Sequence, residues 1–216
     1  MKPFRILLSL MIILAAMILV PQSATATELA TAKKTVQAAI NDGLGTFSGK
    51  TYPLAERSRL LEELLRRYTD PSLLSSIILG RHWKKIAPAE QASFSELFVR
   101  FLVSSYAGQL VDVPTDQIIE VGEPENSSGG KVKVPCIALP QTNTASPTPV
   151  EWEVTDDATG RPVIVNITVE GVSLIRAMQD DFGSVLRSNG GKIEPLVEAL
   201  QRKIAENDRL NAALPR

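Results

Sequence analysis

The residue types that usually carry catalysis are scarce in this chain. His82 is the only histidine, so a metal site built from several imidazoles is excluded. Cys136 is the only cysteine and lies in an apolar segment, where no neighbouring cation would lower the pKa of its thiol. No nucleophile elbow, phosphate-binding loop or paired-cysteine zinc spacing occurs. We therefore expect neither an enzyme nor a metal or cofactor site.

The charged residues are no better arranged for acid–base chemistry. Two aspartate pairs, at 156–157 and 180–181, are adjacent in sequence, and adjacent side chains diverge on a strand or a helix. Arg81, Lys84 and Lys85 form a basic cluster after a short apolar helix. This cluster suits a phosphate head group or a protein partner, and it suits an ordinary solvated turn equally well.

The first 26 residues have the pattern of a secretory signal peptide. Lys2 and Arg5 precede the uncharged apolar run Ile6–Val20, and Ala24–Ala26 supplies small residues before a cut after position 26. The apolar run is short for a membrane span, which needs about 20 residues. We expect a signal peptide at 1–26, a single domain at 27–216 and a periplasmic location.

Composition narrows the function further. Without Lys2 and Arg5 the chain has 21 basic and 24 acidic residues, and no basic patch carries interleaved aromatic residues. Nucleic-acid binding is therefore not expected. A single cysteine cannot form an internal disulfide, which fits a periplasm better than a eukaryotic secretory route.

Apolar periodicity predicts helices, then strands, then helices. Spacings of three and four predict helices at 28–42, 54–68, 71–79, 88–110, 173–188 and 193–206. Alternation predicts strands at 118–121, 131–139, 150–155 and 162–169, with Val163, Val165, Ile167 and Val169 on one face. The expected fold is α+β: a curved antiparallel sheet of about four strands, wrapped on one face by about six helices. A strongly curved sheet can leave an apolar cavity.

The chain resembles the MlaC family of periplasmic phospholipid-binding proteins, also known as toluene-tolerance auxiliary proteins. Three segments carry the resemblance in order, and each is weak alone: Ile77–Trp83 with Leu-Gly-Arg-His-Trp, Ala87–Gln91 followed by Phe94, Phe98 and Tyr106, and Val169–Leu174 with Val-Glu-Gly-Val-Ser-Leu. The resemblance covers roughly residues 54–206 and implies a nuclear-transport-factor-like core with an apolar cavity.

The chain also departs from the family pattern near the expected cavity. The family usually has a tryptophan at the start of the last strand and an aspartate near its end. In this chain, those places fall at about Pro162 and about Asn166. A Tyr-Arg pair is replaced by Met178 and Gln179, and the run 178–182 is somewhat more similar to the hopanoid-associated HpnM group.

The resemblance implies a lipid shuttle between two transport complexes. The partners would be an inner-membrane ABC transporter complex with its substrate-binding membrane protein, and an outer-membrane lipoprotein complex. The ligand would be a phospholipid held by its acyl tails. A hopanoid or other polycyclic lipid is the first alternative, and a non-catalytic interaction module or a cavity enzyme is the second.

We expect a pocket formed by apolar faces that point toward one another. Its candidate residues are Phe94, Leu97, Phe98, Phe101, Tyr106, Val134, Trp152, Val165, Ile167, Val169, Leu174 and Ile175. Arg81, Lys84 and Lys85 are the candidates for contact with a head group or a partner.

Overall fold

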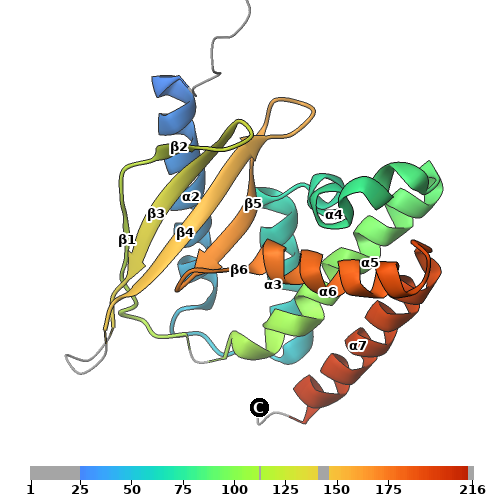
Figure 1. Cartoon of the computed structure of the whole chain (residues 1–216). Helices are drawn as coiled ribbons and strands as arrows, with labels where there is room; N and C mark the ends of the chain where they lie inside the picture. The colour runs from blue at the N-terminus through green and yellow to red at the C-terminus, as the bar shows by residue number, and fades with distance from the viewer. Residues whose placement is uncertain (1–24, 112, 141–145, 214–216) are drawn as a thin grey trace, which may run out of the picture.

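The chain folds as a six-stranded antiparallel sheet beside a group of helices (Figure 1). The computed structural model describes residues 25–111, 113–140 and 146–213. The α+β class is confirmed, with two short strands more than expected. The predicted signal peptide lies outside the described residues up to position 24, and helix α2 (Ala26–Phe47) begins at its last predicted residue, with Thr25 as its N-cap.

The sheet has the strand order β1-β3-β4-β5-β6, with β2 paired to β3. The strands are β1 (Ile119–Val121), β2 (Glu125–Ser127), β3 (Lys131–Ala138), β4 (Thr148–Asp156), β5 (Pro162–Val169) and β6 (Val172–Ser173). Every pairing is antiparallel. Gly171 follows β5 with a φ of 81°, which an L side chain rarely adopts, and so permits the tight turn into β6.

The helices after α2 form the second half of the molecule. They are α3 (Leu54–Tyr68), α4 (Pro71–Leu79), α5 (Pro88–Tyr106), α6 (Leu174–Ser188) and α7 (Glu194–Ala212), with the 3₁₀ turns η1 (Gly80–Lys85) and η2 (Ala107–Gln109). Asp70 caps α4 by accepting a hydrogen bond of 2.9 Å from the backbone N–H of Leu73, and Gly80 ends the helix at a φ of 53°.

The register between β4 and β5 shifts by one residue in the middle of both strands. The pairs on either side of the shift are Glu153 with Asn166 and Val154 with Ile164. Val165 therefore has no residue opposite it. Because side chains alternate along a strand, one extra residue exchanges the two faces for everything beyond it.

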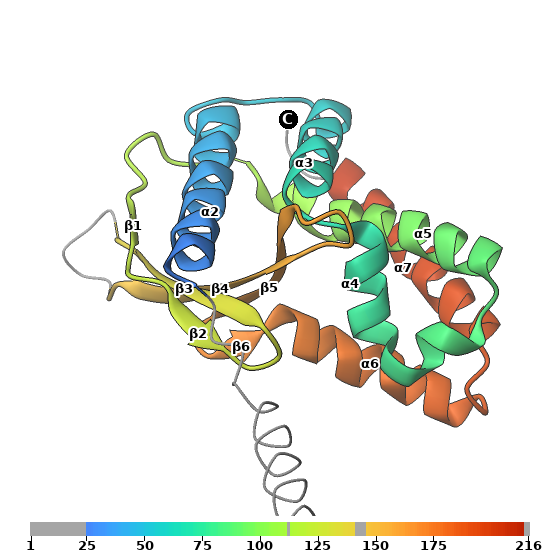
Figure 2. The same cartoon turned by 90° about the horizontal axis from the view of Figure 1, so that it is seen from above.

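This shift divides the apolar residues of β5 between two cores. Val163 and Val165 pack among the helices, whereas Ile164 and Ile167 pack beneath α2. The prediction that Val163, Val165, Ile167 and Val169 share one face is therefore wrong. Figure 2 shows the same division in space, with α2 and α6 on opposite sides of the sheet.

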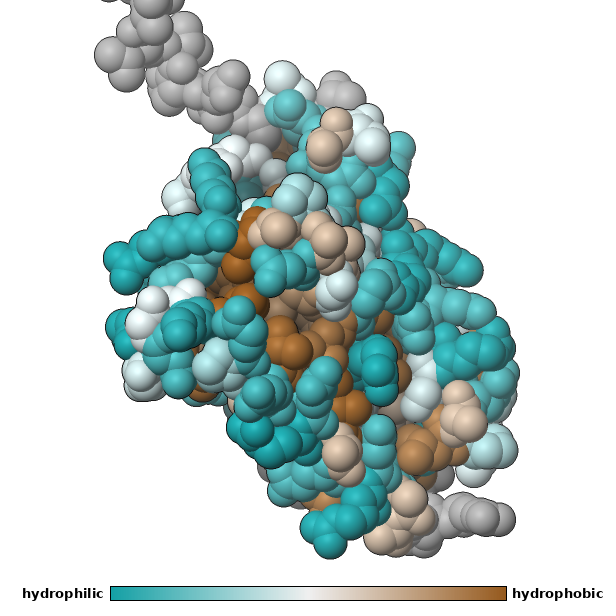
Figure 3. All heavy atoms as spheres, turned by 90° about the vertical axis from the view of Figure 1, so that its right-hand side faces the viewer, coloured by the Kyte–Doolittle hydropathy of each residue, from teal (hydrophilic) through white to brown (hydrophobic). Residues whose placement is uncertain are grey.

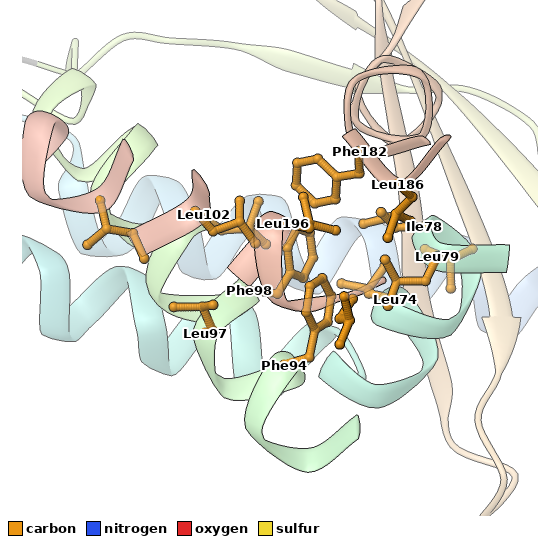
Figure 4. Packing of buried hydrophobic residues seen from close by; sticks show 14 of the residues in the cluster. Leu74, Ile78, Leu79, Phe94, Leu97, Phe98, Leu102, Phe182, Leu186 and Leu196 are labelled. Atoms are coloured by element: carbon orange, nitrogen blue, oxygen red, sulfur yellow. The ribbon is translucent and has the colours of Figure 1, made fainter. Parts of the chain in front are cut away.

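The helical core is centred on Phe98, whose side chain is fully buried. Its ring lies 6.4 Å from that of Phe94, 6.3 Å from that of Phe101 and 6.2 Å from that of Phe182, measured between centroids. Leucine and isoleucine side chains from α4, α6 and α7 complete the cluster (Figure 4). The aromatic stripe of α5 is thus interior packing between helices.

Candidate functional site

One face of the sheet is apolar from edge to edge, and α2 lies across it. Strand register aligns its side chains in three rows, which are Val132–Val154–Ile164, Val134–Trp152–Ile167 and Val121–Cys136–Val150–Val169–Val172. These eleven residues are named the apolar sheet face below. Alternation places Lys131, Lys133, Glu151 and Glu153 on the opposite face, so the thiol of Cys136 is the one ionisable group among these eleven residues.

Cover over the apolar sheet face decreases from β3 toward β6. Val134 and Cys136 are buried beneath α2, with 0% and 3% of their surface exposed. Val169 exposes 37% and Val172 exposes 61%. Along the row Cys136–Val150–Val169–Val172, the side chains therefore pass from buried at Cys136 to exposed at Val172. An apolar ligand could reach the covered end from the open end without crossing a charged group.

Trp152 is the largest side chain of the apolar sheet face and its only aromatic one. The residue is half-buried, packed against the cluster beneath α2. Its indole Nε1 is buried and has no hydrogen-bond partner in the described structure.

A polar network occupies the other face at the same level. Glu153 accepts hydrogen bonds from Lys131 Nζ at 2.9 Å, from Ser127 Oγ at 3.1 Å and from Asn166 Nδ2 at 3.3 Å. Burial disfavours the charge of this carboxylate, but these bonds outweigh burial and hold the pKa of Glu153 below its ordinary value of 4.5. The network secures β3, β4 and β5 behind the apolar sheet face.

The structure divides the twelve predicted pocket residues into two groups. The helical core holds Phe94, Leu97, Phe98 and Val165, with Phe101, Tyr106 and Ile175 packed against it. The apolar sheet face holds Val134, Trp152, Ile167 and Val169. Leu174 is half-buried and belongs to neither cluster. The expectation that all twelve face one another is wrong, because the register shift in β5 separates them; their contact with lipid stays a prediction.

Two grooves on the helical half are lined by described residues. One, of about 660 Å³, lies between α5 and α7 and includes Phe94 and Leu97, beside Glu90 and Glu194. The other, of about 420 Å³, runs among α5, α6 and α7 and includes Phe101. On the side of the molecule formed by these helices, apolar residues emerge as a band between hydrophilic margins (Figure 3). The aromatic floor of both grooves is the same core that holds the helices together.

The predicted basic cluster lies at the outer end of the helical half. Arg81, Lys84 and Lys85 belong to η1 and are all exposed. Figure 1 shows this turn at the far end of the helices from β1 and β3. These cations are therefore remote from the apolar sheet face, and contact with a partner suits them better than contact with a lipid held there.

The groups that could react are protected. Burial raises the pKa of the Cys136 thiol to about 11, so its thiolate is scarce near neutral pH. Within residues 25–111, 113–140 and 146–213, no group of three or more His, Cys, Asp or Glu side chains could hold a metal ion. Across the same ranges no helix is both long and apolar enough to cross a bilayer.

Of the eleven residues of the apolar sheet face, seven were not among the predicted pocket residues, and Val150 and Val172 are two of them. Val150 shares the alternation of Trp152 and Val154, so the pattern of β4 contained the signal for it. Val172 belongs to a two-residue strand, which is too short for a sequence pattern to predict. Its pairing with Val169 places it at the end of the row that contains Cys136 and Val150.

Comparisons with known proteins agree with this architecture. A solved phospholipid-binding protein from Ralstonia solanacearum, in complex with a phospholipid, is similar in fold, with a TM-score of 0.70. Its sequence identity to this chain is 23%, and the match covers 82% of this chain and 98% of that one. The family model for the MlaC protein matches residues 33–202, which span both the sheet and the helical half. The chain belongs to the MlaC family.

Proposed function

We propose that this protein binds a phospholipid by its acyl chains and carries it through the periplasm between outer- and inner-membrane transport complexes. The observation that carries the proposal is the apolar sheet face, which passes from fully covered at Val134 to open at Val172. Membership of the MlaC family and the fold shared with a phospholipid-binding protein support it. The protein acts as a carrier and not as an enzyme.

Energetics favour a carrier built in this way. Moving one methylene from water to an apolar site is worth about 0.8 kcal/mol, so two acyl chains total over ~20 kcal/mol. That sum is near the limit of about 18–21 kcal/mol for non-covalent binding. A lipid in a bilayer is already out of water, however, and its transfer into an apolar site is close to neutral. The protein therefore lowers the barrier to crossing water, and direction comes from the partner complexes.

The open end of the face suggests how the lipid sits. Acyl chains would lie along the apolar sheet face, and the head group would remain outside it near Val172, where the surface is exposed. A solvated head group would leave a partner free to take the lipid without opening the core. Arg81 and its neighbours in η1 would then serve docking to a membrane complex.

The test is extraction and mass spectrometry of lipids from the protein purified without detergent from the periplasm of its own cells. A diacyl phospholipid at about one per chain is the expected result. If the extracted lipid is a hopanoid or another polycyclic lipid, the ligand belongs to that class and is not a phospholipid. A folded protein that contains no lipid, and takes none from vesicles, would overturn the carrier function.

A further inference from the structure

The indole of Trp152 is a donor in surroundings that offer no acceptor. Its Nε1 exposes less than 1 Å² and has no hydrogen-bond partner in the described structure. Indole nitrogen can only donate, and buried tryptophan N–H groups usually find a partner. An unpaired buried donor is costly, because its hydration is lost and no bond replaces it.

The side chains around this indole explain why it lacks a partner. Register places Trp152 between Val134 and Ile167, in the middle row of the apolar sheet face. Glu153 and Asn166, which pair with each other across the strands, point to the opposite face, where they are bonded at 3.3 Å. Both cross-strand neighbours of Trp152 are therefore hydrocarbon side chains that offer its indole no acceptor.

We infer that the Trp152 indole donates a hydrogen bond to an ester carbonyl oxygen of the bound lipid. The inference rests on the proposed function, because it needs acyl chains on this face. The ester carbonyl oxygens are the strongest acceptors next to the chains of a diacyl lipid, so they enter an apolar site with them. The next row carries the exposed Val169 and Val172, so a chain entering from that edge reaches the row of Trp152 next, and the side chains that close over its Nε1 move aside for the bond to form.

This contact makes the site selective for ester-linked lipids. A site with a buried donor rejects an analogue that lacks the matching acceptor more strongly than a purely apolar site can. A diether lipid has the same chains and head group but no carbonyl. A polycyclic hydrocarbon likewise offers nothing beside the ring of Trp152. We expect a preference for the diester lipid of about five- to tenfold, the value of one ordinary hydrogen bond.

The experiment is a competition in which the lipid-free protein is loaded from vesicles. The vesicles contain equal amounts of diester and diether phosphatidylglycerol with matched chains, and mass spectrometry counts the two lipids in the protein fraction. The wild type should load about five to ten diester molecules per diether. Trp152→Phe keeps an aromatic side chain without the donor and should load the two equally. Trp83→Phe, which changes the chain's other tryptophan in η1, should keep the wild-type ratio.

Each other outcome has one meaning. Equal loading by the wild type, or an unchanged ratio in Trp152→Phe, overturns the inference and leaves the carrier function standing. A wild type that loads neither lipid overturns the carrier function instead. If Trp152→Phe does not fold, the Trp83→Phe protein still decides, because Trp152 is then the only source of an indole ¹⁵N–¹H signal. That signal should shift downfield with the diester lipid and not with the diether, and the same shift with both lipids would overturn the inference.

Discussion

Asn166 on β5 accepts a hydrogen bond of 3.0 Å from the hydroxyl of Ser173, the residue that caps α6. The same amide oxygen accepts from the backbone N–H of Ile175 at 3.3 Å, and Ser173 in turn accepts from the backbone N–H of Arg176. One side chain thus sets the angle between the last long strand and the following helix. The amide oxygen of Asn166 makes contacts that a carboxylate oxygen could also make.

Removing this amide should loosen the corner between β5 and α6. Asn166→Ala leaves the hydroxyl of Ser173 and the N–H of Ile175 without their acceptor, so the free energy of unfolding should fall by about 1–3 kcal/mol. Urea denaturation measures the change. Asn41→Ala is the matched control, because Asn41 is exposed and bonds to Gln37 across one helical turn; its effect should stay within about 0.5 kcal/mol. Equal effects of the two changes would contradict the role given to Asn166.

A polar side chain on the apolar sheet face should prevent lipid binding. Ile167→Gln or Val169→Gln places an amide among acyl chains without filling the helical core, so we expect a folded protein that purifies without lipid. Lipid extraction and circular dichroism measure the two properties. Val197→Gln, in the groove between α5 and α7, is the control and should retain its lipid. Lipid loss in the control with retention in both face variants would place the ligand between those helices.

The aromatic residues of α5 should act on stability. Phe98 is fully buried and contacts three other phenylalanine rings, so Phe98→Ala should lower the free energy of unfolding by about 3–5 kcal/mol. Phe98→Leu should lose clearly less, because it retains most of the volume. Thermal and urea unfolding give both values. A Phe98→Ala protein of normal stability that has lost its lipid would mean that the ring lines the binding site.

The ion pair behind the apolar sheet face should make stability depend on pH. The pKa of Glu153 is lowered in the folded protein, so its contribution is present above the unfolded value of about 4.5 and is lost as pH falls through the folded value. Lys131→Met removes its strongest partner and should cost about 1 kcal/mol at pH 7. The difference from the wild type should shrink in acid, at a pH below the folded pKa of Glu153, where this carboxyl is protonated in both proteins.

Urea denaturation at the two pH values measures this effect. Lys203→Met is the control, because Lys203 pairs with Glu206 on an exposed surface where both side chains are about half accessible. Its effect should be small at either pH. A loss for Lys131→Met that is the same at both pH values would mean that its aliphatic stem, not its charge, supports the sheet.

Local signals in the sequence determined most helix boundaries. Helix α3 runs over the predicted residues, and α4 begins at Pro71 after the Asp70 cap and ends before Gly80, as predicted. These helix boundaries are set by capping residues next to the helix ends, so a few neighbouring residues in the sequence are enough to predict them. The C-terminal ends of α2, α5 and α7 are exceptions. Helix α5 was expected to reach residue 110 and ends at Tyr106, and α7 was expected to end at residue 206 and continues to Ala212. Helix α2 was expected to end at Gly43 and continues to Phe47, because Leu44 and Phe47 are covered in the folded chain and this burial outweighs the two glycines.

The face of each strand residue was decided by pairing, which is a tertiary property. The alternation of β5 is unbroken in sequence, yet the unpaired Val165 leaves Val163 in the helical core and Ile167 in the core beneath α2. No local preference encodes such a shift, because it depends on which residue of β4 lies opposite. The apolar residues themselves could therefore be predicted, but not their division between the helical core and the apolar sheet face. That division depends on contacts between segments far apart in the chain.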